Sequence, residues 1–146
     1  MKHGFRLASV LRARQAQEDA ARGEVVRARH AAAQAAETAA AKDRSLANHQ
    51  MPNEDTARAL VAALTARQAM AASLAMARQL AGIAEAQVVR ETEELTEAAK
   101  RRRTVEKLAE RHAEQHRRKV QAADQNALDE LAITDSARSA AREVRS

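Results

Sequence analysis

Two histidines, His112 and His116, lie four residues apart with Glu114 between them. On a helix this spacing places both imidazoles on one face, as in the H-E-x-x-H motif that binds zinc. Ala113 stands where that motif needs its catalytic glutamate, and the chain has no cysteine and no apparent third ligand. A glycine-rich phosphate loop and an activated serine are also missing. We therefore predict no catalytic residue, no metal site, no cofactor and no small-molecule substrate.

A run of four basic residues, Lys100 to Arg103, makes nucleic acid the main alternative to a protein partner. The sequence pI of about 10.4 points the same way. Proteins that bind single strands stack the bases on aromatic side chains, whereas Phe5 is the one aromatic residue of this chain. Acidic residues are interleaved with the basic ones, and no recognised DNA-binding module is present. We favour a protein partner and expect no nucleic acid.

Charged residues four apart form two rows in the same region. Like charges at this spacing mildly destabilise an isolated helix. The rows are either a solvated helix face or a stripe that fits a charged partner. The basic row is Arg103, Lys107 and Arg111, and the acidic row is Glu106, Glu110 and Glu114.

Both ends of the chain carry apolar side chains without an evident partner. Near the C-terminus the apolar residues are Val120, Ala123, Ala127, Leu128 and Leu131. A docking surface, a self-association patch and a frayed tail are all consistent with such a strip. Near the N-terminus the apolar residues are Phe5, Leu7, Val10 and Leu11, and the basic residues around them are Arg6, Arg12 and Arg14.

The composition predicts that these residues are carried by helices. Hydrophobic residues make up 45% of the 146 residues, and 39 of them are alanine, with three glycines and one proline in the chain. Alanine, leucine, arginine and glutamate favour helix, and large strand-forming side chains are scarce. The most apolar stretch, Met70 to Ala86, contains Arg78 and is expected to be too polar to span a bilayer. No signal peptide is evident, so we expect a cytoplasmic protein.

Helix-breaking residues gather at 49–53, where Pro52 disfavours helix at Met51 and Asn53 can cap a helix that begins at Glu54. The predicted fold is a single all-α domain over residues 1–146, a two-helix antiparallel coiled-coil hairpin. Its helices cover about 7–48 and 54–131, joined by a loop at about 49–53. Residues 132–146 form either a short final helix capped by Thr134, Asp135 and Ser136 or a disordered tail.

Heptad repeats predict which residues form the seam of this hairpin. In the first helix the two core lines are Leu11, Glu18, Val25, Ala32, Ala39 and Leu46, and Leu7, Arg14, Ala21, Ala28, Ala35 and Lys42. In the second helix they are Leu60, Arg67, Leu74, Ala81, Val88 and Leu95, and Ala63, Met70, Ala77, Ala84, Glu91 and Ala98.

The predicted loop also sets a register between the helices. A tight turn near residue 52 makes the numbers of facing residues add up to about 104. The basic N-terminus then faces an acidic run formed by Glu91, Glu93, Glu94 and Glu97. About 34 residues of the second helix extend beyond the first, and we expect that overhang to be only partly helical in water.

Two motifs resemble those of the flagellar export proteins of the FliJ family. At the N-terminus Phe5-Arg6-Leu7, Val10-Leu11 and Arg14 match the pattern F-R-L-x-x-V-L-x-x-R. At the other end Lys107-Leu108 and Glu110-Arg111 precede a basic stretch. Further on, Gln125, Leu128-Asp129-Glu130 and Ala132 follow the pattern E-Q-x-x-L-D-E-x-A, with Asp124 in place of its first glutamate.

The resemblance implies a non-enzymatic stalk of the flagellar type III export apparatus, related to the central stalk of rotary ATPases. Its expected partners are the hexameric export ATPase, whose pore takes the terminal segments, and the cytoplasmic domain of the export gate protein, with export chaperones as further candidates. The location implied is the inner face of the cell membrane, and the protein alone is expected to be mostly monomeric. A homo-oligomeric coiled-coil scaffold is the third hypothesis.

The predicted partner-binding residues come from both ends of the chain. They are Phe5, Arg6, Leu7, Val10, Leu11, Arg14, Leu108, Arg111, Val120, Gln125, Leu128, Asp129, Glu130 and Leu131.

Overall fold

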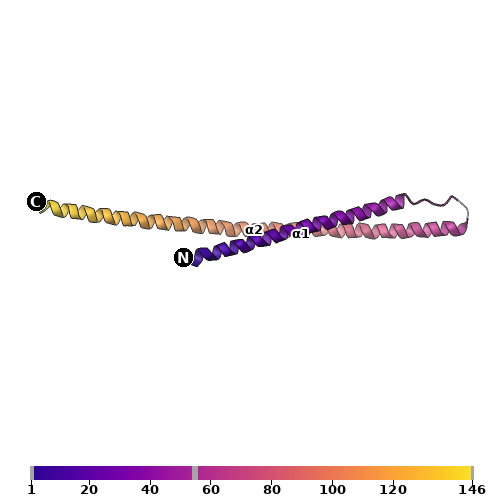
Figure 1. Cartoon of the computed structure of the whole chain (residues 1–146), viewed down its shortest axis with the longest axis horizontal. Coiled ribbons are helices and arrows are strands. Elements are labelled where there is room, and N and C mark those ends of the chain that lie inside the picture. Colours follow the sequence, from indigo (N-terminus) through magenta and orange to yellow (C-terminus); the bar gives the residue numbers. More distant parts are fainter. Residues whose placement is uncertain (1, 54–55, 146) are drawn as a thin grey trace. The chain divides into compact units, whose positions relative to one another are not determined.

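The protein consists of two helices, α1 (Lys2–Ala47) and α2 (Ala57–Glu143), seen in a computed structural model (Figure 1). The structure describes residues 2–53 and 56–145, with side chains from Arg6 onward. No strand occurs in these ranges, so the prediction of an all-α fold with a longer second helix is confirmed.

The chain divides into two compact units. Residues 14–101 form the hairpin unit, and residues 1–13 together with 102–146 form the terminal unit. Assignment of the whole chain to one domain stays a prediction.

Both helices are longer than the sequence indicated. The first begins at Lys2, and the second continues to Glu143 through the region where a cap or a disordered tail was expected. Thr134 lies inside α2, where its Oγ1 donates a hydrogen bond to the Glu130 carbonyl oxygen at 2.8 Å. A hydroxyl that bonds back to the preceding turn is typical of a helix interior.

The connection between the helices begins after Ala47 and ends at Thr56. The Asn48 amide still donates to the Arg44 carbonyl oxygen at 2.9 Å. Thr56 is the N-cap of α2, because its Oγ1 accepts a hydrogen bond from the Ala59 amide at 3.2 Å. The cap predicted at Asn53 is therefore wrong, and Glu54, predicted as the first residue of the helix, lies outside the described residues.

In the hairpin unit the predicted seam of α1 faces inward. Val25, Ala28 and Ala39 are buried, and so is the carboxylate-bearing Glu18. The other predicted core positions of α1 in this unit are half-buried. The heptad pattern thus identified the correct face of the helix.

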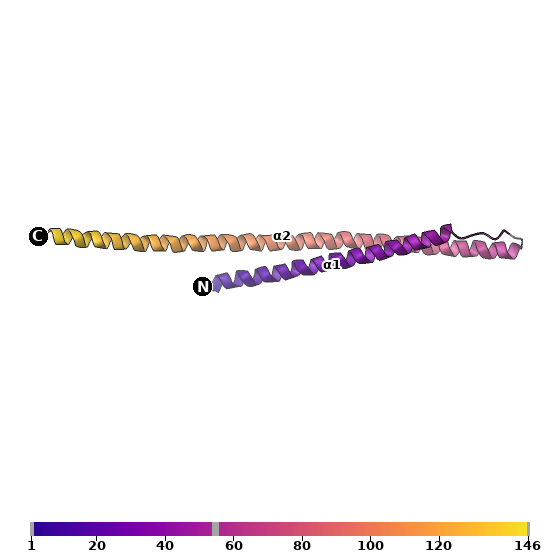
Figure 2. The ribbon, with the colours of Figure 1, turned by 45° about the horizontal axis from the view of Figure 1, so that its top comes forward.

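The register between the helices differs from the predicted one. That register placed Lys42 opposite Ala62. Instead the Lys42 Nζ donates a hydrogen bond to the Ser73 Oγ at 2.6 Å, and Arg78 pairs with Asp43 at 2.8 Å. In both views α1 and α2 lie side by side in this unit (Figures 1 and 2). The pairing is displaced along α2 by about two heptads, a shift that keeps the same faces together.

Charged residues follow the displaced register as well. Arg14, predicted to lie near Glu91, donates a hydrogen bond to the Gln17 side chain at 3.1 Å. The negative charge of Glu91 contributes instead to the raised pKa of Arg27, after the larger effect of the hydrogen bond between Arg27 and Glu24. Arg6 and Arg12 belong to the terminal unit, and their expected pairing with the acidic run stays a prediction.

Two predicted seam positions of α2, Leu60 and Arg67, are exposed, and their assignment to the core is wrong. Both residues precede the part of α2 that pairs with α1. Lys42 pairs with Ser73, and α1 ends only five residues later, at Ala47. From Met70 to Ala98 the predicted core residues are buried or half-buried, with Leu74 and Ala77 the best shielded.

Candidate docking site

The terminal unit contains most of the predicted partner-binding residues. At its N-terminal segment Arg6 and Val10 are exposed, whereas Leu7 and Leu11 are half-buried. The side chain of Phe5 lies outside the described residues. Arg14 falls in the hairpin unit and is half-buried there, so the structure divides the predicted N-terminal set between the two units.

The C-terminal part of α2 is fully exposed: every described residue from 115 to 145 is accessible to solvent. Leu128 and Leu131 are 60% and 66% exposed, and Val120 is also exposed. At about 100° per residue these three side chains fall within an arc of about 80° on α2. The large side chains of the predicted strip therefore form a narrow apolar line along this part of α2.

Of the polar members of the predicted set, Gln125 borders this line, whereas Asp129 and Glu130 lie on other sides of α2. The Gln125 Nε2 donates to the Asp129 Oδ1 at 3.0 Å, and Glu130 contributes its backbone carbonyl to Thr134. Leu108 and Arg111 are exposed but lie on other sides of α2, so they do not continue the strip. Sequence analysis left out Ile133, an exposed residue in the segment treated as an uncertain tail.

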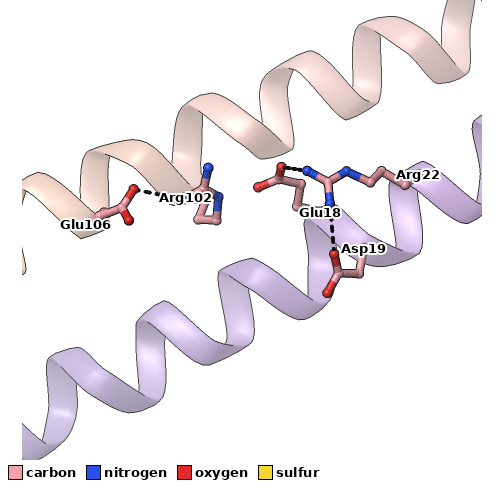
Figure 3. A network of polar contacts seen from close by, with 5 residues as sticks. All are labelled: Glu18, Asp19, Arg22, Arg102 and Glu106. Atoms are coloured by element: carbon pink, nitrogen blue, oxygen red, sulfur yellow. Dashed lines mark hydrogen bonds and ion pairs between the residues drawn. The ribbon is translucent and has the colours of Figure 1, made fainter.

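Two carboxylates of the acidic row, Glu106 and Glu114, pair with arginines three or four residues away. Glu114 accepts hydrogen bonds from Arg117 at 2.8 Å and from Arg118 at 3.0 Å. Glu106 pairs in the same way with Arg102 at 2.8 Å (Figure 3). Pairs of this kind on an exposed helix contribute a few tenths of a kcal/mol each. Their main effect is to reduce the positive potential of this part of the chain.

The basic run Lys100 to Arg103 is partly neutralised too. The Lys100 Nζ lies 2.9 Å from Glu97, and this hydrogen bond lowers the pKa of the Glu97 carboxyl. Arg102 is only half-exposed and engages Glu106. An unbroken basic patch suited to nucleic acid is therefore not formed by these side chains.

One buried charge lies at the seam of the hairpin unit. Glu18 is 4% exposed, and its Oε1 accepts a hydrogen bond from the Arg22 Nη2 at 2.7 Å. Arg22 also reaches Asp19 at 3.4 Å, so one exposed guanidinium serves two carboxylates (Figure 3). The i, i+4 spacing of Glu18 and Arg22 is the sequence signal for this pair.

The histidine pair remains a surface feature. His112 and His116 are exposed, and no group of three or more potential metal ligands occurs among the residues that the structure describes.

An exposed apolar region at the start of α2 was missed by sequence analysis. Within α2, an 18-residue window has a mean hydropathy of 1.4 and at most two charged residues, and only 6% of it is buried. By length and composition this window is apolar enough to cross a membrane, which corrects the expectation that the chain has no such stretch. A core helix of a soluble protein can have the same length and composition.

Comparison with known protein families assigns the chain to a family over most of its length. The family model described as "Flagellar FliJ protein" matches residues 1–141. No curated protein and no solved structure matches the chain. The matched region includes the hairpin unit and the candidate docking residues at both ends.

Proposed function

The chain belongs to the flagellar FliJ protein family, and from this membership we propose that it is a stalk and assembly component of the flagellar export apparatus. The family is a non-catalytic component of flagellar export. In the proposed role the terminal segments enter the hexameric export ATPase and the hairpin unit extends towards the export gate protein. The protein then acts through contacts and carries out no reaction of its own.

The observation that supports this proposal is the exposed C-terminal helix with its narrow apolar strip. Residues 115–145 have no shielded side chain, and Leu128 and Leu131 project from them. A lone helix is about 10 Å across, which suits a segment that must fit inside a ring. Such a helix gains stability when its apolar strip is covered by another protein.

The chemistry of the strip suits a contact that is made and broken repeatedly. Burying one leucine side chain contributes about 1.5–3 kcal/mol, so a strip of two or three large residues gives modest affinity. The surrounding ion pairs of Glu114 with Arg117 and Arg118 are exposed and can exchange partners at low cost. Weak contacts of this kind allow successive ATPase subunits to bind and release the same helix one after another.

A location at the inner face of the cell membrane follows from the same proposal. The export gate protein lies in the membrane, and a stalk that links it to the ATPase works beside the bilayer. Export chaperones are further proposed partners.

The proposal is tested with the export ATPase and the full chain. Replacing both strip leucines, Leu128→Glu with Leu131→Glu, should weaken binding to the ATPase hexamer by at least about tenfold, because two apolar contacts are lost. Stimulation of ATP hydrolysis should fall with it. The matched control is Val26→Glu with Val89→Glu, which changes two equally exposed apolar residues of the hairpin unit.

Three results would count against the proposal. In the first two, the wild-type chain binds the hexamer no better than an unrelated helical protein, or it leaves the turnover of the hexamer unchanged. In the third, the Val26→Glu with Val89→Glu control loses as much binding as the leucine variant. Tight, salt-dependent binding to duplex DNA would favour the nucleic-acid alternative. A stable dimer at micromolar concentration would favour the scaffold.

A further inference from the structure

The first turns of α2 extend beyond the end of α1. Ala47 ends α1 five residues after Lys42, which contacts Ser73, so the last residue of α1 faces α2 near residue 68. Residues 57–67, the leading segment, precede that point. Leu60, Val61 and Leu64 are 48%, 62% and 50% exposed there.

The leading segment is apolar nearly all the way round. Its polar residues are Arg58, Thr65 and Arg67, and five of the remaining eight are alanine. Helices that are apolar on every side belong in a protein core or in lipid. A protein core does not apply, because none of the residues of the leading segment is buried.

Charge in this region is entirely basic. From Thr56 to Ala84 the chain has three arginines and no acidic residue. Arg78 is held by Asp43 at 2.8 Å, while Arg58 and Arg67 are exposed on the leading segment itself. Two acids precede the segment in the sequence, outside the described residues.

Helix geometry places these arginines on either side of the apolar residues. At about 100° per residue, Leu60, Leu64 and Val61 share an arc of about 100°, with Arg67 at one border and Arg58 beyond the other. Arginine side chains at such borders lay their methylene groups along apolar surface and keep the guanidinium in a polar layer. This arrangement is typical of helices that bind at the surface of a membrane.

We propose that the leading segment inserts into the surface of an anionic lipid bilayer. Leu60, Val61 and Leu64 enter the boundary between headgroups and acyl chains, and Arg58 and Arg67 contact lipid phosphates. Insertion is peripheral, because eleven helical residues span only about 16 Å, against about 30 Å for a bilayer core.

Lipid fits this surface better than a second helix does. A partner helix needs a seam of apolar residues that repeats every three and four positions. The line that starts at Leu60 reaches Arg67 one heptad later, which interrupts such a seam. Lipid acyl chains need no repeat. The inference stands independently of the proposed contact with the ATPase.

Vesicle flotation with the full chain provides the first test. The wild type should float with vesicles of phosphatidylethanolamine and phosphatidylglycerol and bind neutral phosphatidylcholine vesicles much less. Leu60→Gln with Leu64→Gln should weaken partitioning by at least about tenfold, because two apolar side chains no longer insert. Leu128→Gln with Leu131→Gln, a leucine pair that is more exposed still, should bind as the wild type does.

A fluorescence reporter tests where insertion occurs. The chain has no tryptophan, so one introduced residue gives the whole signal. Emission of the Val61→Trp variant should shift to shorter wavelength when anionic vesicles are added, because the indole leaves water. Val89→Trp, another exposed valine on α2, should show no shift.

The proposal is overturned if the wild type does not float with anionic vesicles. It is also overturned if both leucine pairs have the same effect, which would indicate adsorption by the net charge of +5. If the Leu60 and Leu64 changes instead convert a dimer to a monomer and leave flotation unchanged, a second copy covers the leading segment and the proposal is overturned. Normal stimulation of the ATPase by the Leu60→Gln with Leu64→Gln variant would show that lipid binding and the proposed stalk function depend on different residues.

Discussion

Polar residues at heptad core positions show what the sequence indicated about individual side chains. The pattern placed Glu18 and Lys42 at the seam, and both are shielded in the structure. Their partners did not follow from the pattern. Glu18 bonds Arg22 one turn away, whereas Lys42 bonds Ser73, whose position depends on the register between the helices. Periodicity identifies the face of a helix, and only the pairing of the helices identifies the neighbour.

Replacing Glu18 by leucine should stabilise the hairpin unit. A carboxylate that is 4% exposed has lost most of its hydration, while its partner Arg22 is 61% exposed and largely screened. Replacing a buried ion pair by well-packed apolar residues is often neutral or stabilising by about 1–4 kcal/mol, and the Arg22 guanidinium that remains here is exposed. We expect Glu18→Leu to raise the thermal midpoint by several degrees, measured by circular dichroism.

Asp19 supplies the control for this prediction. Its carboxylate contacts the same Arg22 at 3.4 Å but is 61% exposed. Asp19→Ala should change the free energy of unfolding by less than about 0.5 kcal/mol. A midpoint that falls in Glu18→Leu and holds in Asp19→Ala would mean that the buried carboxylate stabilises the seam.

At the scale of the helices, the fold was predictable and the register was not. The alanine-rich composition and Pro52 predicted two helices and a connection, and these are present. A heptad pattern looks the same after a shift of seven or fourteen residues, so it cannot distinguish between pairings that differ by whole heptads. The length of the connection decides among them. That length was misjudged because α2 begins at Ala57, after a cap by Thr56.

Crosslinking measures the register directly. The chain has no cysteine, so introduced pairs react only with each other. Lys42→Cys with Ser73→Cys should crosslink efficiently through a short bismaleimide, because these side chains are in contact. Lys42→Cys with Ala62→Cys, which corresponds to the register of a tight loop, should react poorly. Efficient reaction of the second pair alone would show that the tight-loop register is the populated one.

At the scale of the whole chain, exposed apolar residues occur in both units, and the sequence revealed only those of the terminal unit. The strip with Leu128 and Leu131 was found because its apolar residues have no partner in the predicted hairpin, and Leu128 also belongs to the family motif. The leading segment with Leu60 was missed because the heptad frame assigned that leucine to the core. An acid-free stretch from 56 to 84 was the signal available in the sequence, since charged residues make up 31% of the chain as a whole.

Truncation separates the structural and the docking roles of the C-terminal helix. A chain that ends at Glu114 loses residues 115–146, and every described residue among them is exposed. Removal of such residues should leave the thermal midpoint of the hairpin unit within a few degrees of the full chain, since they shield nothing. Binding to the export ATPase should be lost, because the strip with Leu128 and Leu131 is gone. Circular dichroism and ATPase stimulation, measured on the same preparations, give the two readouts. A midpoint that drops by tens of degrees would show that the C-terminal helix supports the fold, and full stimulation by the truncated chain would place the ATPase contact elsewhere.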